Sequence, residues 1–334
     1  MKWIKRIALV LVVTVAALAT FAVATARRTE HPVGLQVVRV ESPSGPIAVA
    51  LWYPTDAAPR PTTFIGGALL SVARDAEPVG EGLPLVVVSH GNGGSATSHV
   101  DLAMDLASAG YVVATPTHAG DNLADASRQG DPAIFSQRAG QLRATLDHVL
   151  TDWPDRARID PARVGAYGMS AGGFTVLTLV GGTPRMAAIA GHCRDAREFV
   201  CDALAHAKSP LLQGGDAAGA FATDPRVRAA VVAAPGLGFT FAEGGLAAVR
   251  VPVQLWKGEH DDTVPAATNA DVIAHELGDR VEAHDVAGAT HLSFLAPCGL
   301  LRPPGVCSDR DGFDREAMHA DMNRAIRAFF DTHL

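Results

Sequence analysis

The sequence has few charged residues and no block of lysines and arginines after its first segment. Charged residues make up 19% of the chain, and the formal net charge is -7. A nucleic-acid-binding domain carries a basic patch for the phosphate backbone, so this composition argues against a nucleic-acid partner. The chain also lacks an internal repeat. Its 334 residues are 48% hydrophobic, which is enough to form one large domain with a sizeable core.

Cysteine is scarce as well, with four residues in the whole chain. Four cysteines allow three pairings, and we favour Cys193 with Cys201 and Cys298 with Cys307, so that each bond closes one short loop. Neither pair has Cys-x-x-Cys spacing, so a zinc site is the less favoured interpretation. We expect no metal and no cofactor.

The first 26 residues have the pattern of a targeting segment. Lys2, Lys5 and Arg6 precede an apolar run over 7–24, and Ala-Thr-Ala at 24–26 is a small-residue cleavage pattern. The run is also long enough to cross a bilayer, so an uncleaved membrane anchor is the alternative. Either interpretation places the domain over 33–334 outside the cytoplasm, as a periplasmic, secreted or anchored protein. Membrane contact is then expected only through this segment.

The most informative motif is Gly-Met-Ser-Ala-Gly at 168–172, which follows a predicted strand and precedes a predicted helix. A sharp turn between a strand and a helix forces its central serine into a strained conformation and admits only small neighbours. This context predicts that Ser170 is a nucleophile at such a turn. A serine hydroxyl needs a base, and the base needs an acid to orient it.

Two later strand ends offer that base and acid. The predicted strand 251–256 leads to Asp261, and the predicted strand 281–286 leads to His291. Catalytic groups of α/β sheets lie at the carboxyl ends of strands, and the order serine, acid, histidine is typical of α/β hydrolases. We favour Asp261 over its neighbour Asp262, which we expect to be solvated or to start a helix.

A glycine-rich turn supplies the fourth part of the expected site. The apolar strand 85–89 leads to His-Gly-Asn-Gly-Gly-Ser at 90–95. We expect the backbone N–H groups of Asn92 and Ala171 to form an oxyanion hole, with the His90 ring supporting the loop. His118, after another strand end, is a candidate for lining the site. His99 and His319 lie on predicted helices and are interpreted as surface or packing residues.

Strands that alternate with helices predict an α/β fold with a mostly parallel sheet and helices on both faces. We expect two leading antiparallel strands, an irregular connection over 57–82, and a small cap inserted at about 183–224. The remaining expected elements are strands at 111–115, 163–167 and 229–234, and helices at 98–108, 135–150, 174–180 and 314–332.

The chain resembles the secreted dienelactone-hydrolase-like group of α/β hydrolases, which is itself similar to platelet-activating-factor acetylhydrolases. The resemblance covers most of the chain after residue 26. It rests on the residues at 51–54, 89–94, 110–114, 168–173, 258–265 and 290–291.

Two departures from these families matter. Dienelactone hydrolase proper has a cysteine nucleophile, whereas this chain has Ser170, so the resemblance implies the fold and not that substrate. The acetylhydrolases take their acid from an earlier strand, but the matching strand here, 229–234, ends in Pro-Gly-Leu-Gly without a carboxylate. Asp261 is therefore the remaining candidate for the catalytic acid that the resemblance implies.

The sequence thus predicts a serine carboxylesterase that acts on a small-molecule or lipid-like ester through an acyl-enzyme. A phospholipase similar to the acetylhydrolases, or a lipase, is an alternative within enzymes. A catalytically inactive binding module is the alternative outside them.

Overall fold

The structure is a computed structural model that describes residues 2–63, 69–196, 198–215, 219–299 and 302–334. Its centre is a ten-stranded sheet in the order β10-β9-β8-β7-β5-β6-β2-β1-β4-β3. The six strands from β5 to β10 run parallel to one another, and β6 pairs antiparallel with β2. The strands are β1 (Val33–Val40), β2 (Ile47–Pro54), β3 (Arg60–Thr63), β4 (Leu69–Arg74), β5 (Leu83–Ser89), β6 (Val112–Pro116), β7 (Ile159–Met169), β8 (Val227–Ala233), β9 (Val253–Gly258) and β10 (Val281–Val286).

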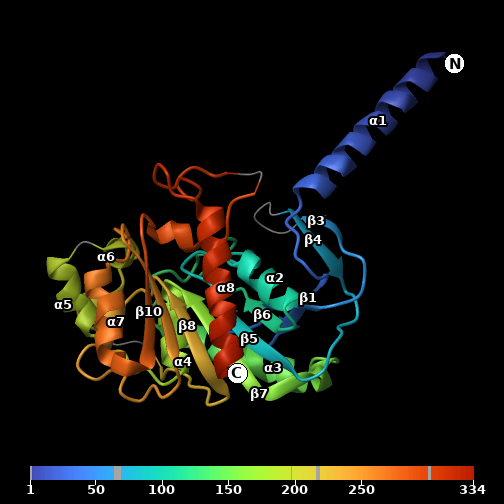
Figure 1. The fold of residues 1–334 in the computed structure, drawn as a ribbon. Helices are drawn as coiled ribbons and strands as arrows, with labels where there is room; N and C mark the ends of the chain where they lie inside the picture. The colour runs from blue at the N-terminus through green and yellow to red at the C-terminus, as the bar shows by residue number, and fades with distance from the viewer. Residues whose placement is uncertain (1, 64–68, 197, 216–218, 300–301) are drawn as a thin grey trace.

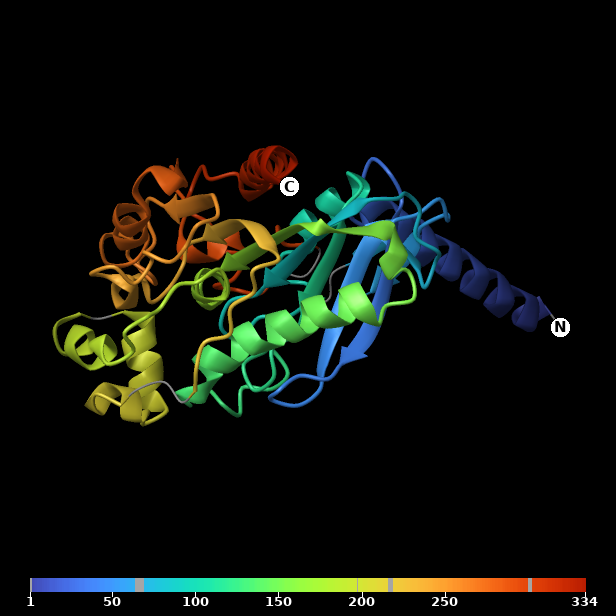
Figure 2. The same ribbon diagram turned by 90° about the horizontal axis from the view of Figure 1, so that it is seen from below.

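Helices cover both faces of this sheet. Figure 2 shows α8 (red) on one side and α3 (green) on the other. The α-helices are α1 (Lys2–Thr25), α2 (Val100–Ser108), α3 (Ala133–Thr151), α4 (Ala171–Leu179), α5 (Ala188–Asp195), α6 (Phe199–His206), α7 (Ala270–Leu277) and α8 (Arg315–His333). The expected α/β class, with a mostly parallel sheet between two helical layers, is confirmed.

The core is divided by the sheet into two apolar clusters. Along β5, Leu85 and Val87 face the cluster that contains α3 and α4, and Val86 and Val88 face the cluster that contains α2 and α8. Such alternation is the period-2 pattern of a strand, and both faces are apolar because both are covered. The sheet is therefore held rigidly, and the loops at its edges start from fixed positions.

One expectation about the sheet was wrong. Residues 57–82 were expected to form an irregular connection, but they contain β3 and β4, which pair antiparallel, while β4 also pairs parallel with β1. Leu70 and Val72 point into the core and alternate with less buried residues. The prolines and glycines around this short alternation obscured it, and β3 lies at the sheet edge, where proline is tolerated.

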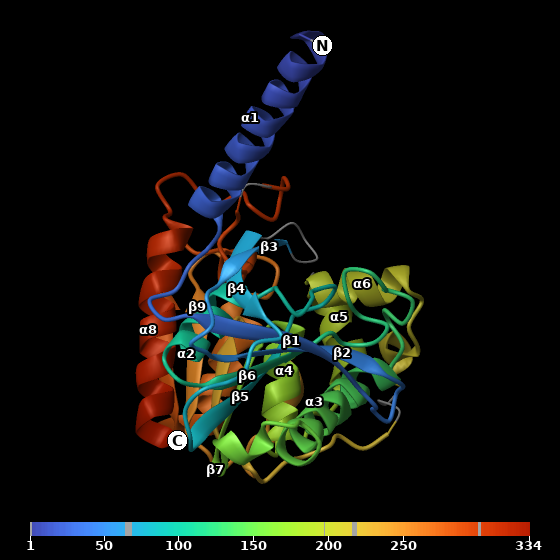
Figure 3. The ribbon, with the colours of Figure 1, turned by 90° about the vertical axis from the view of Figure 1, so that its right-hand side faces the viewer.

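The segment between α4 and β8 contains α5, α6 and a short 3-10 helix, η2 (Pro210–Gln213). We refer to residues 183–224 as the cap segment. Figure 3 shows α5 and α6 on the α3 side of the molecule, with α8 on the opposite side.

The N-terminal helix α1 projects away from the domain (Figure 1). It is the one helix in the described ranges that is long and apolar enough to cross a membrane, and its apolar stretch is not buried against the domain. Its last turn leads into Arg27, which forms an isolated parallel β-bridge with Leu70 of β4.

Candidate active site

Ser170 lies on a strained turn between β7 and α4. Its backbone has φ of 58° and ψ of -122°, a region that residues with a side chain seldom adopt. A Cβ at Gly168 would come within 2.1 Å of the Gly172 oxygen, and a Cβ at Gly172 within 2.0 Å of the Ser89 oxygen. Both positions therefore require glycine, and the tight turn directs the Ser170 side chain out of the sheet.

Three polar side chains form a hydrogen-bonded chain at the carboxyl edge of the sheet. Nε2 of His291 lies 2.9 Å from Oγ of Ser170, and Nδ1 of His291 lies 2.7 Å from Oδ2 of Asp261. Both His291 and Asp261 are buried, whereas Asp262 is exposed to solvent. The structure thus brings together the three residues that the sequence singled out.

The turns on either side hold the acid and the base. Oδ1 of Asp261 accepts hydrogen bonds from the backbone N–H groups of Thr263 and Val264, at 3.1 and 2.7 Å. His291 begins a short 3-10 helix, η6 (His291–Phe294), which Thr290 and Ser293 close by a reciprocal capping box. Asp261 can therefore keep its other oxygen aimed at the imidazole.

The loop after β5 brings backbone donors to the same place. Within the described residues, the N–H groups of Asn92 and Ala171 donate to no protein atom. Ala171 is the first residue of α4, where N–H groups lack an intrahelical acceptor. A Cβ on Gly91 would lie 3.4 Å from Cβ of Ser170, so this loop passes directly beside the serine. Free donors next to Ser170 are the arrangement that an oxyanion needs.

Behind this loop lies a buried polar network that sequence reasoning missed. Arg138 of α3 and Asp121 form an ion pair of 2.6 Å, and both side chains are almost fully inaccessible. Burial, followed by the positive charge of Arg138, lowers the pKa of His90 and of His118 well below the ordinary histidine range. Both rings are therefore neutral at neutral pH.

The His90 prediction and the His118 prediction have different outcomes. Nδ1 of His90 lies 2.7 Å from the Gly91 oxygen, and its Nε2 accepts from the His118 backbone N–H, so the ring lies in the loop as expected. His118 does not line the cavity beside Ser170; it is fully buried between Ser89 and Gln141. Both ring nitrogens of His118 are occupied by buried polar partners, Ser89 of β5 and Gln141 of α3.

His99 and His319 are buried rather than on the surface. His319 of α8 donates from its two ring nitrogens to Asp101 of α2 and to the carbonyl oxygen of Ser293, at 2.7 and 2.9 Å. Asp101 accordingly raises the pKa of His319 against the effect of burial. Because Ser293 belongs to η6, this buried pair supports the turn that carries His291.

A cavity of about 80 Å³ opens beside Ser170 and is lined mainly by apolar side chains. Its apolar lining includes Ile134 and Phe135 of α3, Phe199 and Leu204 of α6, and Leu237. The cap segment therefore contributes to the cavity. The space next to the serine suits a short apolar group.

A disulfide and a buried carboxylate fix α6 over the cavity. Cys193 is bonded to Cys201, and Glu198 lies inside this loop. The Glu198 carboxylate is buried and receives hydrogen bonds from Thr268 and Asn269, which follow the Asp261 turn. The cap segment is thus joined to the loop that carries the acid.

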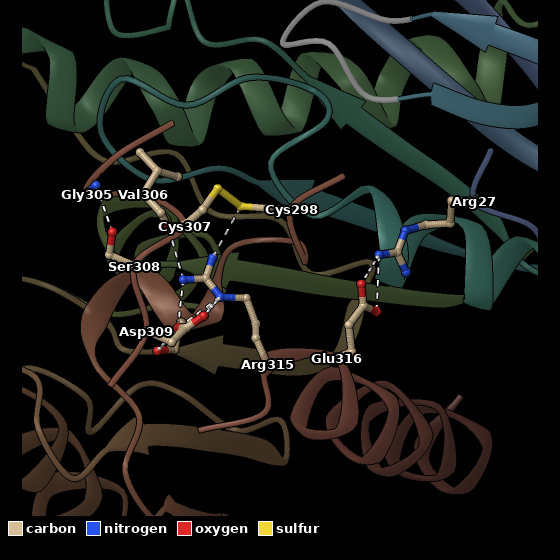
Figure 4. Close-up of a disulfide and its surroundings, with 10 residues drawn as sticks. Arg27, Cys298, Gly305, Val306, Cys307, Ser308, Asp309, Arg315 and Glu316 are labelled. Atoms are coloured by element: carbon tan, nitrogen blue, oxygen red, sulfur yellow. Dashed lines mark hydrogen bonds and ion pairs between the residues drawn. A yellow bond between two sulfur atoms is a disulfide. The ribbon is translucent and has the colours of Figure 1, made fainter. Parts of the chain in front are cut away.

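The second disulfide joins Cys298 and Cys307, in the segment between η6 and α8. Figure 4 shows Arg315 beside this bond, with its guanidinium directed at Asp309. Asp309 also accepts from the Ser293 hydroxyl at 3.0 Å. Within the described residues, no cluster of three or more His, Cys, Asp or Glu side chains could hold a metal ion.

Comparison with known proteins agrees with this architecture. Residues 68–137 match the family model described as platelet-activating factor acetylhydrolase, isoform II. The structure is similar to that of a ferulic acid esterase from Streptomyces cinnamoneus, with a TM-score of 0.60 and 22% identity over 92% of each chain. No curated protein matches the chain significantly. The chain thus has the α/β-hydrolase fold, and over the matched segment it is similar to the acetylhydrolases, as the resemblance in sequence implied.

Proposed function

We propose that the protein is a serine hydrolase that cleaves carboxylic esters. The observation that carries this proposal is the chain of hydrogen bonds from Asp261 through His291 to Ser170, at the mouth of an apolar cavity. The fold and the family match over 68–137 support it, because both relate the chain to hydrolases. Helix α6, held by the Cys193–Cys201 disulfide, forms one wall of the acyl site.

The mechanism has two steps. His291 Nε2 takes the proton from Ser170 as the serine oxygen attacks the ester carbonyl, and Asp261 stabilises the resulting imidazolium. The N–H groups of Asn92 and Ala171 donate to the carbonyl oxygen as it becomes negative. His291 then gives its proton to the leaving alcohol, which leaves an acyl group on Ser170.

The second step releases the acid. His291 takes a proton from a water molecule, whose oxygen attacks the acyl carbonyl. The tetrahedral species collapses, the C–O bond to Ser170 breaks, and His291 returns the proton to the serine oxygen. The enzyme is restored with one water consumed.

We infer that the acyl group is short. The cavity beside Ser170 is about 80 Å³, and Phe135, Leu204 and Leu237 bound it. A lipid ester with a short acyl chain is the second candidate, since the matched family is named for an acetylhydrolase of platelet-activating factor. In such a substrate, the long alcohol part would extend from the open side.

Kinetics with purified protein test this proposal. We expect hydrolysis of p-nitrophenyl esters with kcat/KM greatest at two to four acyl carbons, and loss of that activity in Ser170→Ala. p-Nitrophenyl acetate and an acetyl phospholipid ester, compared at equal concentration, separate the two substrate classes. Turnover by Ser170→Ala near the wild-type rate would refute the serine mechanism.

We also propose that the domain over 33–334 works outside the cytoplasm. The apolar α1 and the two disulfides are consistent with export, because structural disulfides persist in oxidising compartments. Residues 1–26 are then a removable leader or an anchor. N-terminal sequencing of the exported protein decides between them: a start at Arg27 indicates cleavage, and an intact start in the membrane fraction indicates an anchor.

A further inference from the structure

We propose that the buried Asp121–Arg138 ion pair is a positioning device for the oxyanion loop. It would hold the turn at 90–93 so that the Asn92 N–H points at the substrate oxygen. This inference rests on the proposed function, because the loop matters only if Ser170 attacks a carbonyl. Neither residue takes or gives a proton in the reaction.

Asp121 holds the loop from one side through a single oxygen. Its Oδ1 accepts from the side-chain amide of Asn92 at 2.6 Å and from the backbone N–H of Gly93 at 3.0 Å. These contacts flank the Asn92 N–H and leave that group free. The Asn92 side chain is also held by Gln129, whose amide donates to it at 3.4 Å. Asn92 is thus fixed although it lies at the surface.

Arg138 holds the loop from beneath. Its Nη1 lies 2.6 Å from Oδ2 of Asp121, and its Nη2 donates to the carbonyl oxygen of His90. Its Nε lies 3.2 Å from the hydroxyl of Thr175 on α4, the helix that begins directly after Ser170. One guanidinium therefore connects the oxyanion loop to the helix that supplies the second donor, the N–H of Ala171.

Burial makes this pair an unusual choice for stability alone. Only 1% of the Arg138 side chain and 4% of the Asp121 side chain are exposed, and desolvation of two charges offsets much of their attraction. An apolar pair would fill the same space, but it could not accept from the Gly93 N–H and donate to the His90 oxygen. The ion pair therefore fixes the orientation of the Gly93 N–H and the His90 carbonyl, which apolar packing could not do.

The sequence contains a signal for the buried arginine, but none for its partner. Arg138 lies four residues after Ile134 and four before Leu142, both buried on the same face of α3. A charge on an apolar helical stripe needs a buried partner. Asp121 meets that need from the loop after β6, a position that local sequence patterns do not connect with α3.

The test compares Asp121→Ala with Asp224→Ala. Asp224 is also a buried aspartate paired with an arginine, Arg226, but it lies at the amino end of β8, opposite the site. Loss of one oxyanion donor lowers turnover by about 10²–10³-fold. For Asp121→Ala, we therefore expect kcat for p-nitrophenyl acetate to fall about 100-fold, with KM within about threefold of wild type. Asp224→Ala should keep kcat.

A second readout separates positioning from folding. A trifluoromethyl ketone forms a serine adduct whose oxygen occupies the oxyanion hole, so its affinity should fall with kcat in Asp121→Ala. Asp121→Asn keeps an acceptor for the Gly93 N–H and should recover part of the lost kcat. If Asp121→Ala does not fold, the same comparison is made with Asp121→Asn and Arg138→Lys, which should each lower kcat at least tenfold.

Two results overturn the inference: kcat within twofold of wild type in the Asp121 variant, or an equal loss in Asp224→Ala at matched stability. Failure of the proposed function is distinguishable from both. In that case, wild-type protein itself would not hydrolyse the ester through Ser170.

Discussion

His319 and Asp101 form a buried ion pair between α8 and α2, with Nδ1 of the imidazole 2.7 Å from a carboxylate oxygen. The other ring nitrogen donates to the Ser293 carbonyl, so both nitrogens have acceptors and the ring is held as the cation. The two residues are 218 positions apart in the chain. Their pairing anchors the C-terminal helix behind the turn that carries His291.

Removal of this imidazole should be strongly destabilising. His319→Leu leaves the Asp101 carboxylate buried without its charged partner, although Asn323 still donates to it. Breaking a buried pair in this way costs roughly 3–5 kcal/mol. Urea unfolding measures the change. Arg324→Leu, which removes an exposed pair with Asp321, should change the free energy of unfolding by less than about 0.5 kcal/mol.

Stability should fall on acidification below about pH 6.5. Burial lowers the pKa of His90, His99 and His118, with the pKa of His99 lowered to about 4. These rings stay neutral in the folded protein but take up protons in the unfolded protein. As pH falls, each therefore lowers the free energy of unfolding by up to about 1.4 kcal/mol per pH unit.

His319 acts with the opposite sign. Its raised pKa contributes stability that is complete below the unfolded value and is lost as pH rises through the folded value. We therefore expect maximal stability near neutrality, a steep fall toward pH 5 and a shallow fall at alkaline pH. Urea midpoints across this range measure the curve. Below about pH 6.5, His99→Asn should reduce the change in the free energy of unfolding per pH unit by the equivalent of about one proton. An unchanged dependence on pH would show that His99 does not take up a proton on unfolding.

The two adjacent aspartates after β9 should differ greatly in effect. Asp261→Asn removes the charge that stabilises the imidazolium and favours the wrong ring tautomer, so kcat should fall about 10⁴-fold with little change in KM. Asp262→Asn is the matched control, because Asp262 is exposed and one residue away. It should retain kcat within about twofold. Equal losses in the two variants would show that Asp261 is not the acid.

Leu204 should limit the acyl length. It lines the cavity from α6, so Leu204→Ala should shift the preferred p-nitrophenyl ester toward longer chains. Leu211→Ala is the control, since Leu211 is equally buried in the cap segment but does not line this cavity. Both variants should lose about 2–5 kcal/mol of stability, while a shift in chain length is expected in Leu204→Ala alone. A shift in both would mean that the cap segment moves as a whole.

The strands, the long helices and the Ser170 turn could be predicted because each leaves a local pattern. Gly168 and Gly172 are required by close backbone approach, and Met322 and Ile326 of α8 lie on one apolar stripe. The proposed acid and base followed from strand ends and chain order. These patterns predict where each element lies in the chain and which residues lie at the carboxyl edge of the sheet.

The supporting contacts could not be predicted in this way. Asp121 and Arg138 come from different elements, and Asp101 lies more than 200 residues from its partners His319 and Asn323. Helix α7 was not predicted, and β3 was obscured by Pro61 within it and Pro59 beside it. Such contacts depend on how the elements pack, and a sequence pattern with a period of two or 3.6 residues carries no record of a partner on another element.

Covalent labelling with a fluorophosphonate, followed by mass spectrometry of the modified peptide, tests directly whether Ser170 is the nucleophile. We expect one equivalent of phosphonate on Ser170, with labelling abolished in Ser170→Ala and strongly slowed in Asp261→Asn. Labelling at another residue, or the absence of labelling in folded wild-type protein, would contradict this role of Ser170.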